Sequence, residues 1–158
     1  MSRPADAPVE FRAGRSDLSP GRELMAELND LLDTQYPGRV VRPGSVTTPD
    51  EMVPPGGTFL IGFAGDRAVA IGGLRRLDDD LCEIKRMYVV PDARSGGIGR
   101  ALLAALEDAA RALGYRRARL DAGPEQKHSR VLFEDTGYVQ IEKYNRNHIA
   151  DYFAEKRL

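Results

Sequence analysis

The sequence predicts a mixed α/β fold: a mostly antiparallel twisted sheet with a central parallel pair and helices on both faces. Three strand-like runs between residues 58 and 90 are separated only by short polar turns, which favours antiparallel pairing. A helical pattern over 98–113 lies between two strand-like segments. A strand–helix–strand unit of this kind makes its two strands parallel through a right-handed crossover. A further helical pattern precedes the strands, and helices are expected on both faces of the sheet.

The N-terminal third contains one strand, one helix and one long loop. Residues 1–7 are expected to be a loose tail, and the alternating residues 9–13 predict a strand. Residues 20–34 place leucines on one face at helical spacing, and Asp17 or Ser19 is the expected helix cap. Residues 37–57 are rich in Pro and Gly and predict a loop with a helical turn near 50–53.

The remaining elements follow at short intervals. Strands are expected at 58–64, 68–77, 81–90 and 117–122, with closing strands at 139–142 and 152–157. The helix over 98–113 ends at Gly114, and a short helix over 129–136 ends at Gly137, because glycine readily ends a helix. With 158 residues, the chain is expected to form a single domain over 1–158.

The composition of the chain limits which binding partners and which cellular compartment are expected. The chain is 42% hydrophobic and 30% charged with a net charge of −1, which gives no argument for nucleic acid or an anionic membrane as a partner. Its single cysteine, Cys82, excludes an internal disulfide and a site with several Cys ligands. The two histidines lack a ligand cluster, so no metal is expected. Without a signal-like or membrane-length apolar run, the expected location is cytoplasmic.

Residues 83–113 form the segment that indicates chemistry. The run EIKRMYVVPDARSGGIGR over 83–100 reads as a strand, a glycine-rich loop and the start of a helix. The first N–H groups of a helix lack intrahelical partners and lie at its positive end. Gly96, Gly97 and Gly99 allow an oxyanion to approach the backbone, and Arg94 and Arg100 add positive charge. The pattern favours a phosphate site over a plain glycine-rich turn.

Two other phosphate motifs fit less well. A Walker loop requires Gly-Lys-Ser/Thr, which the segment lacks. A dinucleotide fingerprint would use Gly97 and Gly99, with Asp121 about 20 residues further on as the ribose ligand. However, Leu102 stands at the third glycine position, and the loop after the strand is too long for that tight turn.

The run VVPDARSGGIGRALL resembles the acyl-CoA motif of the GNAT superfamily of N-acetyltransferases. The motif is Arg/Gln-x-x-Gly-x-Gly/Ala, which Arg94, Gly97 and Gly99 meet. The later run QKHSRVLFEDTGY resembles the family's short helix before a Gly-Phe/Tyr pair. The resemblance extends over about 58–144, whereas the N-terminal third matches mainly in the order of its elements.

The resemblance implies acetyl-CoA as cosubstrate and a set of residues that bind it. The pyrophosphate would bind the N–H groups of residues 94–100, and the pantetheine would run along the strand at residues 87–89. Val89 N–H would also polarise the thioester carbonyl as a catalytic group. The full set of implied binding residues is Met87, Tyr88, Val89, Arg94, Ser95, Gly96, Gly97, Ile98, Gly99, Arg100, Gln126, Ser129 and Phe133.

The resemblance also implies a general base and exposes a missing acid. Glu83 matches the position of a carboxylate that acts as the base, through water, in several family members. The alternative is a structural role, in which Glu83 pairs with Lys85 or Arg86 or simply faces solvent. Where many members have a tyrosine that protonates the leaving thiolate, this chain has Phe133. Another group, such as Tyr88, Tyr144 or His128, would then serve, or the thiolate leaves unassisted.

These implications predict transfer of an acetyl group from acetyl-CoA to a primary amine of a small molecule or peptide, by direct attack of the amine on the thioester. The polar and aromatic residues 144–148 are candidates for the wall of the acceptor pocket. Two alternatives stay open. One is a catalytically silent acyl-CoA-binding module, which the replacement of the family's tyrosine acid by Phe133 would explain, and the other is an enzyme that acts on protein or peptide amines. A homodimer also stays open.

Overall fold

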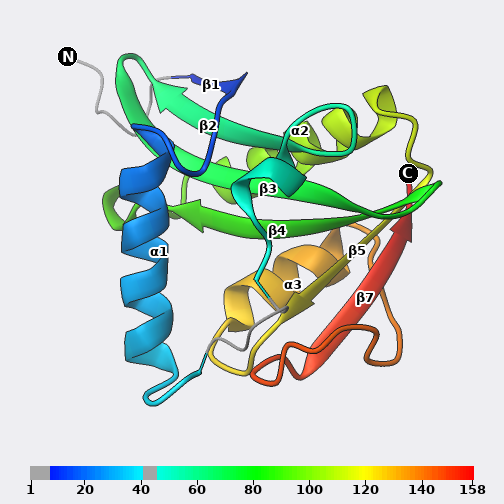
Figure 1. Cartoon of the computed structure of the whole chain (residues 1–158). Coiled ribbons are helices and arrows are strands. Elements are labelled where there is room, and N and C mark those ends of the chain that lie inside the picture. The colour runs from blue at the N-terminus through cyan, green and yellow to red at the C-terminus, as the bar shows by residue number, and fades with distance from the viewer. Residues whose placement is uncertain (1–7, 41–45) are drawn as a thin grey trace.

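The computed structural model of the chain describes residues 8–40 and 46–158 (Figure 1). The loose tail expected at 1–7 lies outside the described residues, and so do residues 41–45 of the predicted long loop. The strands are β1 (Val9–Ala13), β2 (Thr58–Ala64), β3 (Arg67–Asp78), β4 (Leu81–Val89), β5 (Arg117–Ala122), β6 (Val139–Gln140) and β7 (Tyr152–Arg157). The α-helices are α1 (Gly21–Gln35), α2 (Ile98–Ala112) and α3 (Lys127–Asp135), and the short 3-10 helices are η2 (Pro49–Met52) and η3 (Pro91–Ala93).

A seven-stranded sheet in the order β1-β2-β3-β4-β5-β7-β6 organises the chain. Every neighbouring pair is antiparallel except β4 and β5, so the predicted central parallel pair is confirmed. That pair is short: only Leu81–Glu83 of β4 lie in register with Arg117–Arg119 of β5. Beyond Glu83 the two strands separate, and an opening forms between their carboxyl ends (Figure 1).

Helices cover both faces of the sheet, as predicted. A Cβ atom added to Gly72 of β3 would collide with Leu106 of α2. A Cβ atom added to the next residue, Gly73, would collide with Met52 of η2 on the opposite face. Because successive residues of a strand face opposite sides, α2 and η2 lie on different faces. Both glycines are therefore required by close packing.

The start of α1 differs from the prediction. The expected caps Asp17 and Ser19 are wrong: the N-cap is Pro20, without a side-chain hydrogen bond. Asp17 instead binds Arg15, with 2.8 Å between Arg15 Nε and Asp17 Oδ1. The apolar face is as expected, because Leu24 and Leu28 are buried against the sheet. Packing of this stripe therefore defines the helix without a polar cap.

The turn expected near residues 50–53 is η2, held by reciprocal capping. The Thr48 backbone N–H donates to Glu51 Oε1 at 3.0 Å, and the Thr48 side chain accepts from the Glu51 backbone N–H. This arrangement is a capping box. Later boundaries shift slightly, since α3 begins two residues earlier than expected and β6 is shorter than the predicted strand.

A β-bulge bends β4 at the opening. Tyr88 pairs with Ile71 and Lys85 with Gly73, so Arg86 and Met87 together oppose the single residue Gly72. Arg86 has φ of 61°, a left-handed conformation that is uncommon for a residue other than glycine. A bulge of this kind turns the strand, and here it directs the end of β4 away from β5. None of the described helices is long and apolar enough to cross a membrane.

Candidate active site

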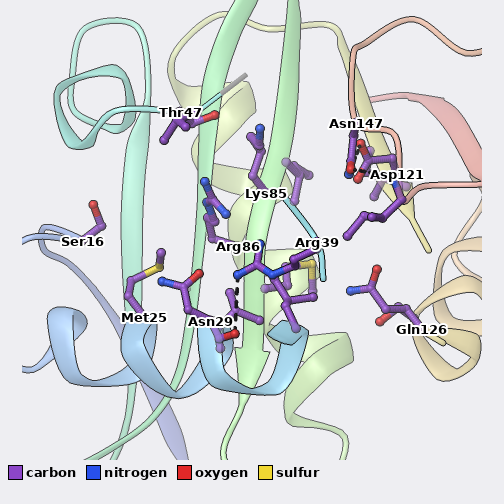
Figure 2. Close-up of a pocket in the computed structure, with 18 of the residues that line it drawn as sticks. Ser16, Met25, Asn29, Arg39, Thr47, Lys85, Arg86, Asp121, Gln126 and Asn147 are labelled. Carbon is purple, nitrogen blue, oxygen red and sulfur yellow. Dashed lines mark hydrogen bonds between the residues drawn. The ribbon is translucent and has the colours of Figure 1, made fainter. Parts of the chain in front are cut away.

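A cleft of about 800 Å³ occupies the opening between β4 and β5 (Figure 2). Its walls come from α1, from the bulged part of β4, from the end of β5, from the start of α3 and from the loop before β7. Four of the residues expected to bind acetyl-CoA line it, namely Met87, Gln126, Ser129 and Phe133. The cleft therefore reaches from α1 on one face of the sheet to α3 on the other.

The glycine-rich loop presents free backbone donors at the start of α2. The first helical hydrogen bond runs from Ala101 N–H to Gly97 O at 3.0 Å, so the N–H groups of Ile98, Gly99 and Arg100 come before it. Gly97 has φ of 81° and makes no side-chain cap. A Cβ atom on Gly97 would meet nothing within 4 Å, so the space beside these donors is open.

Arg94 joins this loop to the end of β4. Arg94 Nε donates to Val89 O at 2.9 Å, and its guanidinium lies 5.5 Å from the centre of the Tyr88 ring. Arg100 lies at the edge of the same loop, 3.9 Å from Asp135, with both side chains more than half exposed. An ion pair so exposed contributes little stability, so the charge of Arg100 is available to a ligand.

The backbone of Val89 faces the opening. Val90 N–H donates to Val69 O at 2.9 Å, which makes these two residues a hydrogen-bonded pair of the antiparallel ladder. The adjoining pair, Ala70 and Val89, is then non-hydrogen-bonded. The N–H of Val89 consequently points away from β3, toward the side where β5 has separated.

Glu83 is enclosed, with each carboxylate oxygen bound twice. Its relative exposure is 1%. Oε1 accepts from Arg75 Nε at 3.0 Å and pairs with Lys85 Nζ at 3.4 Å, while Oε2 accepts from Tyr144 Oη at 2.6 Å and Asn145 Nδ2 at 3.1 Å. Glu83 therefore does not face solvent. It forms the ion pair with Lys85 that the sequence allowed, and its arginine partner is Arg75 instead of Arg86.

The surroundings of Glu83 favour its ionised form. Burial acts to raise the pKa of Glu83, but Lys85 and the hydrogen bonds from Tyr144 and Asn145 outweigh burial and hold that pKa below its ordinary value. Glu83 is not one of the described residues that line the cleft. It is a stable anion behind the wall of the cleft.

Asp121 is the cleft carboxylate that sequence reasoning missed. It lies near the end of β5, and its Oδ2 accepts from Asn145 Nδ2 at 2.7 Å and from Asn147 Nδ2 at 3.3 Å (Figure 2). Burial, supported by the negative charge of Glu83, raises the pKa of Asp121. The signal available in the sequence was an aspartate at the carboxyl end of a strand in a parallel pair. In the sequence, Asp121 was considered only as the ribose ligand of a dinucleotide motif.

Comparison with known proteins agrees with this geometry. The sequence model of the acetyltransferase (GNAT) family matches residues 25–138. The chain belongs to the GNAT family of acetyltransferases. An IAA acetyltransferase of Azospirillum brasilense is 32% identical over 118 residues, which is 74% of this chain and 75% of that protein.

Solved structures of GNAT acetyltransferases share the fold. A GNAT-family acetyltransferase from Staphylococcus aureus superposes with a TM-score of 0.77 at 15% identity, covering 95% of this chain and 99% of that one. The N-acetylglutamate synthase of Neisseria gonorrhoeae, solved with coenzyme A and N-acetyl-glutamate, gives a TM-score of 0.70 at 21% identity. It covers 97% of this chain and 36% of its own.

Acetyl-CoA-dependent acyl transfer is the general reaction of GNAT acetyltransferases, and the residues of this member fit the cosubstrate. The loop from Arg94 to Arg100 has free N–H donors next to open space, which suits a pyrophosphate. The outward N–H of Val89 and the cleft that Met87 lines suit an extended pantetheine. Within the described part of the chain, no group of three or more His, Cys, Asp or Glu side chains could hold a metal ion.

The three residues considered as replacements for the family's tyrosine acid are not among the described residues that line the cleft of this GNAT protein. Phe133 lines the cleft and packs 5.9 Å from the Tyr138 ring. Tyr144 Oη is engaged by Glu83, and burial raises the pKa of Tyr144. The cleft is not lined, within the described part of the chain, by Tyr88, Tyr144 or His128. Of the segment 144–148, Asn147 and His148 line the cleft, together with Arg146.

Proposed function

We propose that this chain transfers the acetyl group of acetyl-CoA to a primary amine of a small molecule or peptide. The observation on which this rests is the gap between β4 and β5 beyond Glu83: the N–H of Val89 points toward it from β4, and the carboxylate of Asp121 lies on its β5 side. The free donors at the start of α2 follow β4 in the chain. When bound, acetyl-CoA supplies a thioester whose carbonyl carbon the amine attacks directly, with the thiolate as leaving group.

The residues of the loop and strand would bind and orient the cosubstrate. The backbone of residues 94–100 would bind the pyrophosphate, with Arg94 and Arg100 adding charge. The backbone of residues 87–89 would align the pantetheine, and Val89 N–H would stabilise the negative charge that develops on the carbonyl oxygen. Gln126, Ser129 and Phe133 would form the facing wall, since they line the cleft.

The amine must lose a proton, and two carboxylates are candidates to receive it, the buried Glu83 and the half-buried Asp121. An alkyl ammonium group has a pKa of about 10.4, so at neutral pH most of the acceptor is protonated. Glu83 is the base that the family resemblance implies, but three hydrogen-bond donors and the ammonium group of Lys85 occupy its carboxylate behind the cleft wall. We therefore propose that Asp121 accepts the proton, directly or through one water, while Glu83 holds Lys85 and Asn145 in place.

The comparisons support a small acceptor. The IAA acetyltransferase relative covers most of the chain, and the N-acetylglutamate synthase neighbour was solved with a small N-acetylated product. A cleft of about 800 Å³ is of the size that accommodates small ligands. Peptide and protein amines remain the second acceptor class.

Release of free thiol from acetyl-CoA tests the proposal. The protein is incubated with acetyl-CoA and a panel of primary amines and peptides, and the acetylated product is identified by mass spectrometry. We expect amine-dependent thiol release with stoichiometric N-acetylation. Tight CoA binding without release for any amine or peptide would instead identify a catalytically silent acyl-CoA-binding module.

A further inference from the structure

Cationic side chains outnumber carboxylates along the described lining of the cleft. Five cationic side chains line the cleft, against two carboxylates, among the described residues. The cations are Arg22, Arg39, Lys85, Arg86 and Arg146, and the carboxylates are Asp33 and Asp121. Figure 2 shows Arg39, Lys85 and Arg86 over β4 and α1, with Asp121 on the far wall. We call the part lined by Arg39, Lys85 and Arg86 the cationic end of the cleft, and Asp121 lies across from it.

The three cations at the cationic end differ in how they are neutralised. Lys85 is paired with Glu83 at 3.4 Å. Arg39 Nε is paired with Asp33 at 2.7 Å, and its Nη2 donates to Asn29 O at 3.5 Å. Arg86 Nε, by contrast, is buried and has no hydrogen-bond partner among the residues that the structure describes. A buried donor without a partner costs about 1–3 kcal/mol.

The surroundings and the backbone of Arg86 are both unfavourable for a cationic side chain. Burial and the nearby positive charge of Arg39 lower the pKa of Arg86. The backbone at Arg86 also has φ of 61°, in the region that side chains other than glycine rarely adopt. A cation held in this way, at a bulge that aims its side chain into a cleft, is suited to receiving an anion.

We propose that the acceptor is an amine that also has a carboxylate, as an amino acid has, and that Arg86 binds this carboxylate beside Arg39. The inference rests on the proposed function. The planar guanidinium of Arg86 matches a carboxylate with two parallel hydrogen bonds. The amino group of the same molecule then extends toward Asp121 and the opening between β4 and β5, where the N–H of Val89 faces it.

The polarity of the cleft favours such a molecule over a plain amine. An amine without a carboxylate would offer no anionic group to the Arg86 guanidinium at the cationic end. A site built to bind a polar group strongly rejects an analogue that lacks it, because the buried partner remains unpaired. An amino acid in its zwitterionic form carries one anionic and one cationic group, and the cleft offers Arg86 to the first and Asp121 to the second.

Matched acceptor pairs test the inference. The common L-amino acids are compared with their α-amides, and with the amines that lack the carboxyl group, in thiol release from acetyl-CoA. We expect at least one amino acid to exceed its amide by roughly 10- to 100-fold in kcat/KM. In parallel, calorimetry on the CoA-saturated protein compares binding of the same compounds without turnover.

Substitution of Arg86 assigns the effect to this side chain. Arg86→Met should raise the KM for the preferred amino acid roughly 10- to 100-fold, with little change in the KM for the matching amide. Arg12→Met, at an exposed arginine of β1 that is not among the residues lining the cleft, should change neither. If Arg86→Met fails to fold, Arg39→Met replaces it with the same expectation.

The outcomes separate this inference from the proposed function. Carboxylate-selective binding without thiol release supports recognition by Arg86 and contradicts the proposed function. Thiol release that is equal for amino acids and their amides contradicts the inference and leaves the function standing. Loss of CoA affinity in Arg86→Met would assign the cationic end to the cosubstrate and overturn the inference.

Discussion

The carboxylates of Glu83 and Asp121 share one amide group. Asn145 Nδ2 donates to Glu83 Oε2 at 3.1 Å and to Asp121 Oδ2 at 2.7 Å. The environments displace the two pKa values in opposite directions, downward for Glu83 and upward for Asp121. When the environments of two neighbouring carboxyl groups displace their pKa values in opposite directions, the two groups commonly have different roles in catalysis. Here Glu83 is a fixed anion, and Asp121 is the group with access to the cleft.

The first prediction separates these roles by kinetics. Asp121→Asn should lower kcat by about 10²–10⁴-fold at neutral pH, the usual contribution of a positioned base, while CoA affinity is kept. In the wild type, the rate should rise with pH through the raised pKa of Asp121, which lies above its ordinary value of 3.8. The variant should lack that rise and approach the wild-type rate at high pH, where more amine is neutral.

Glu83→Gln is the matched comparison for that experiment. Its effect on kcat should be smaller than that of Asp121→Asn, because Glu83 lies behind the cleft wall. Should Glu83→Gln abolish turnover in a fully folded protein while Asp121→Asn does not, the base is Glu83, as the family resemblance implies. Steady-state pH–rate profiles for the three proteins decide between the two carboxylates.

The second prediction concerns stability. Removing one partner of a buried ion pair costs about 3–5 kcal/mol. Lys85 and Arg75 keep 21% and 26% of their side-chain surface exposed, so they can rehydrate in part. Glu83→Gln should therefore lower the free energy of unfolding by about 3 kcal/mol, at the lower end of that range. Urea unfolding at several pH values measures the difference.

The pH dependence of that difference has a defined sign. The folded pKa of Glu83 is lower than its ordinary value of 4.5, so its ionised form stabilises the fold. This contribution is complete above pH 4.5 and is lost as the pH falls through the lowered folded pKa. The wild type and Glu83→Gln should therefore converge in strongly acidic solution. A gap that widens toward low pH would contradict the assignment.

Much of the fold was predictable because its signals are local. The bounds of β1, β2, β5 and β7 agree with the predicted strands to the residue. Alternating side chains, short polar turns and the glycines after two helices are all visible in consecutive residues. The start of α1 was mispredicted because Asp17 had two uses, and its pairing with Arg15 prevailed over capping.

The candidate site was predictable only where its residues are close in sequence. The loop from Arg94 to Arg100 has its backbone donors beside one another, so spacing alone located it. The partners of Glu83 come instead from Arg75, Tyr144 and Asn145, and only the folded chain brings them to one carboxylate. The bulge at Arg86 leaves no clear mark in the sequence either, because it occurs at an arginine rather than a glycine.

The third prediction tests the glycine-rich loop. Gly97→Val forces a β-branched residue into φ of 81° and fills the open space beside the α2 donors. It should weaken CoA binding by about tenfold or more, the loss expected when hydrogen bonds to a charged group are broken. Calorimetric titration with CoA measures the effect.

Gly65→Val is the control for that substitution. Gly65 has φ of 63° and open space around it, like Gly97, but it lies in the turn between β2 and β3. Both variants should lose a similar stability, about 1–2 kcal/mol for a left-handed non-glycine residue. Only Gly97→Val should lose CoA affinity. Equal affinity in the two variants would place the pyrophosphate elsewhere.

The last prediction concerns protonation of the leaving thiolate. Phe133 lines the cleft at the position where many family members have a tyrosine acid. Among the described residues, neither Tyr88 nor Tyr144 lines the cleft, and Tyr144 Oη already donates to Glu83 at 2.6 Å. A simple thiol has a pKa of about 8–9, so its thiolate can leave without an acid. Phe133→Tyr should therefore leave kcat unchanged or raise it.

Tyr144→Phe completes this test, because its two readouts separate the roles of that hydroxyl. If Tyr144 only stabilises the Glu83 anion, the variant should lose stability by about 1.5–3 kcal/mol, the value of a hydrogen bond to a charged group, and keep its kcat within a few-fold. If Tyr144 protonates the thiolate, kcat should fall by about 10²–10⁴-fold with CoA affinity retained. The combined variant Phe133→Tyr/Tyr144→Phe would then recover turnover, since the new hydroxyl would lie on the cleft wall. We expect no such recovery, because the geometry assigns Tyr144 to Glu83 and leaves the thiolate to take its proton from water.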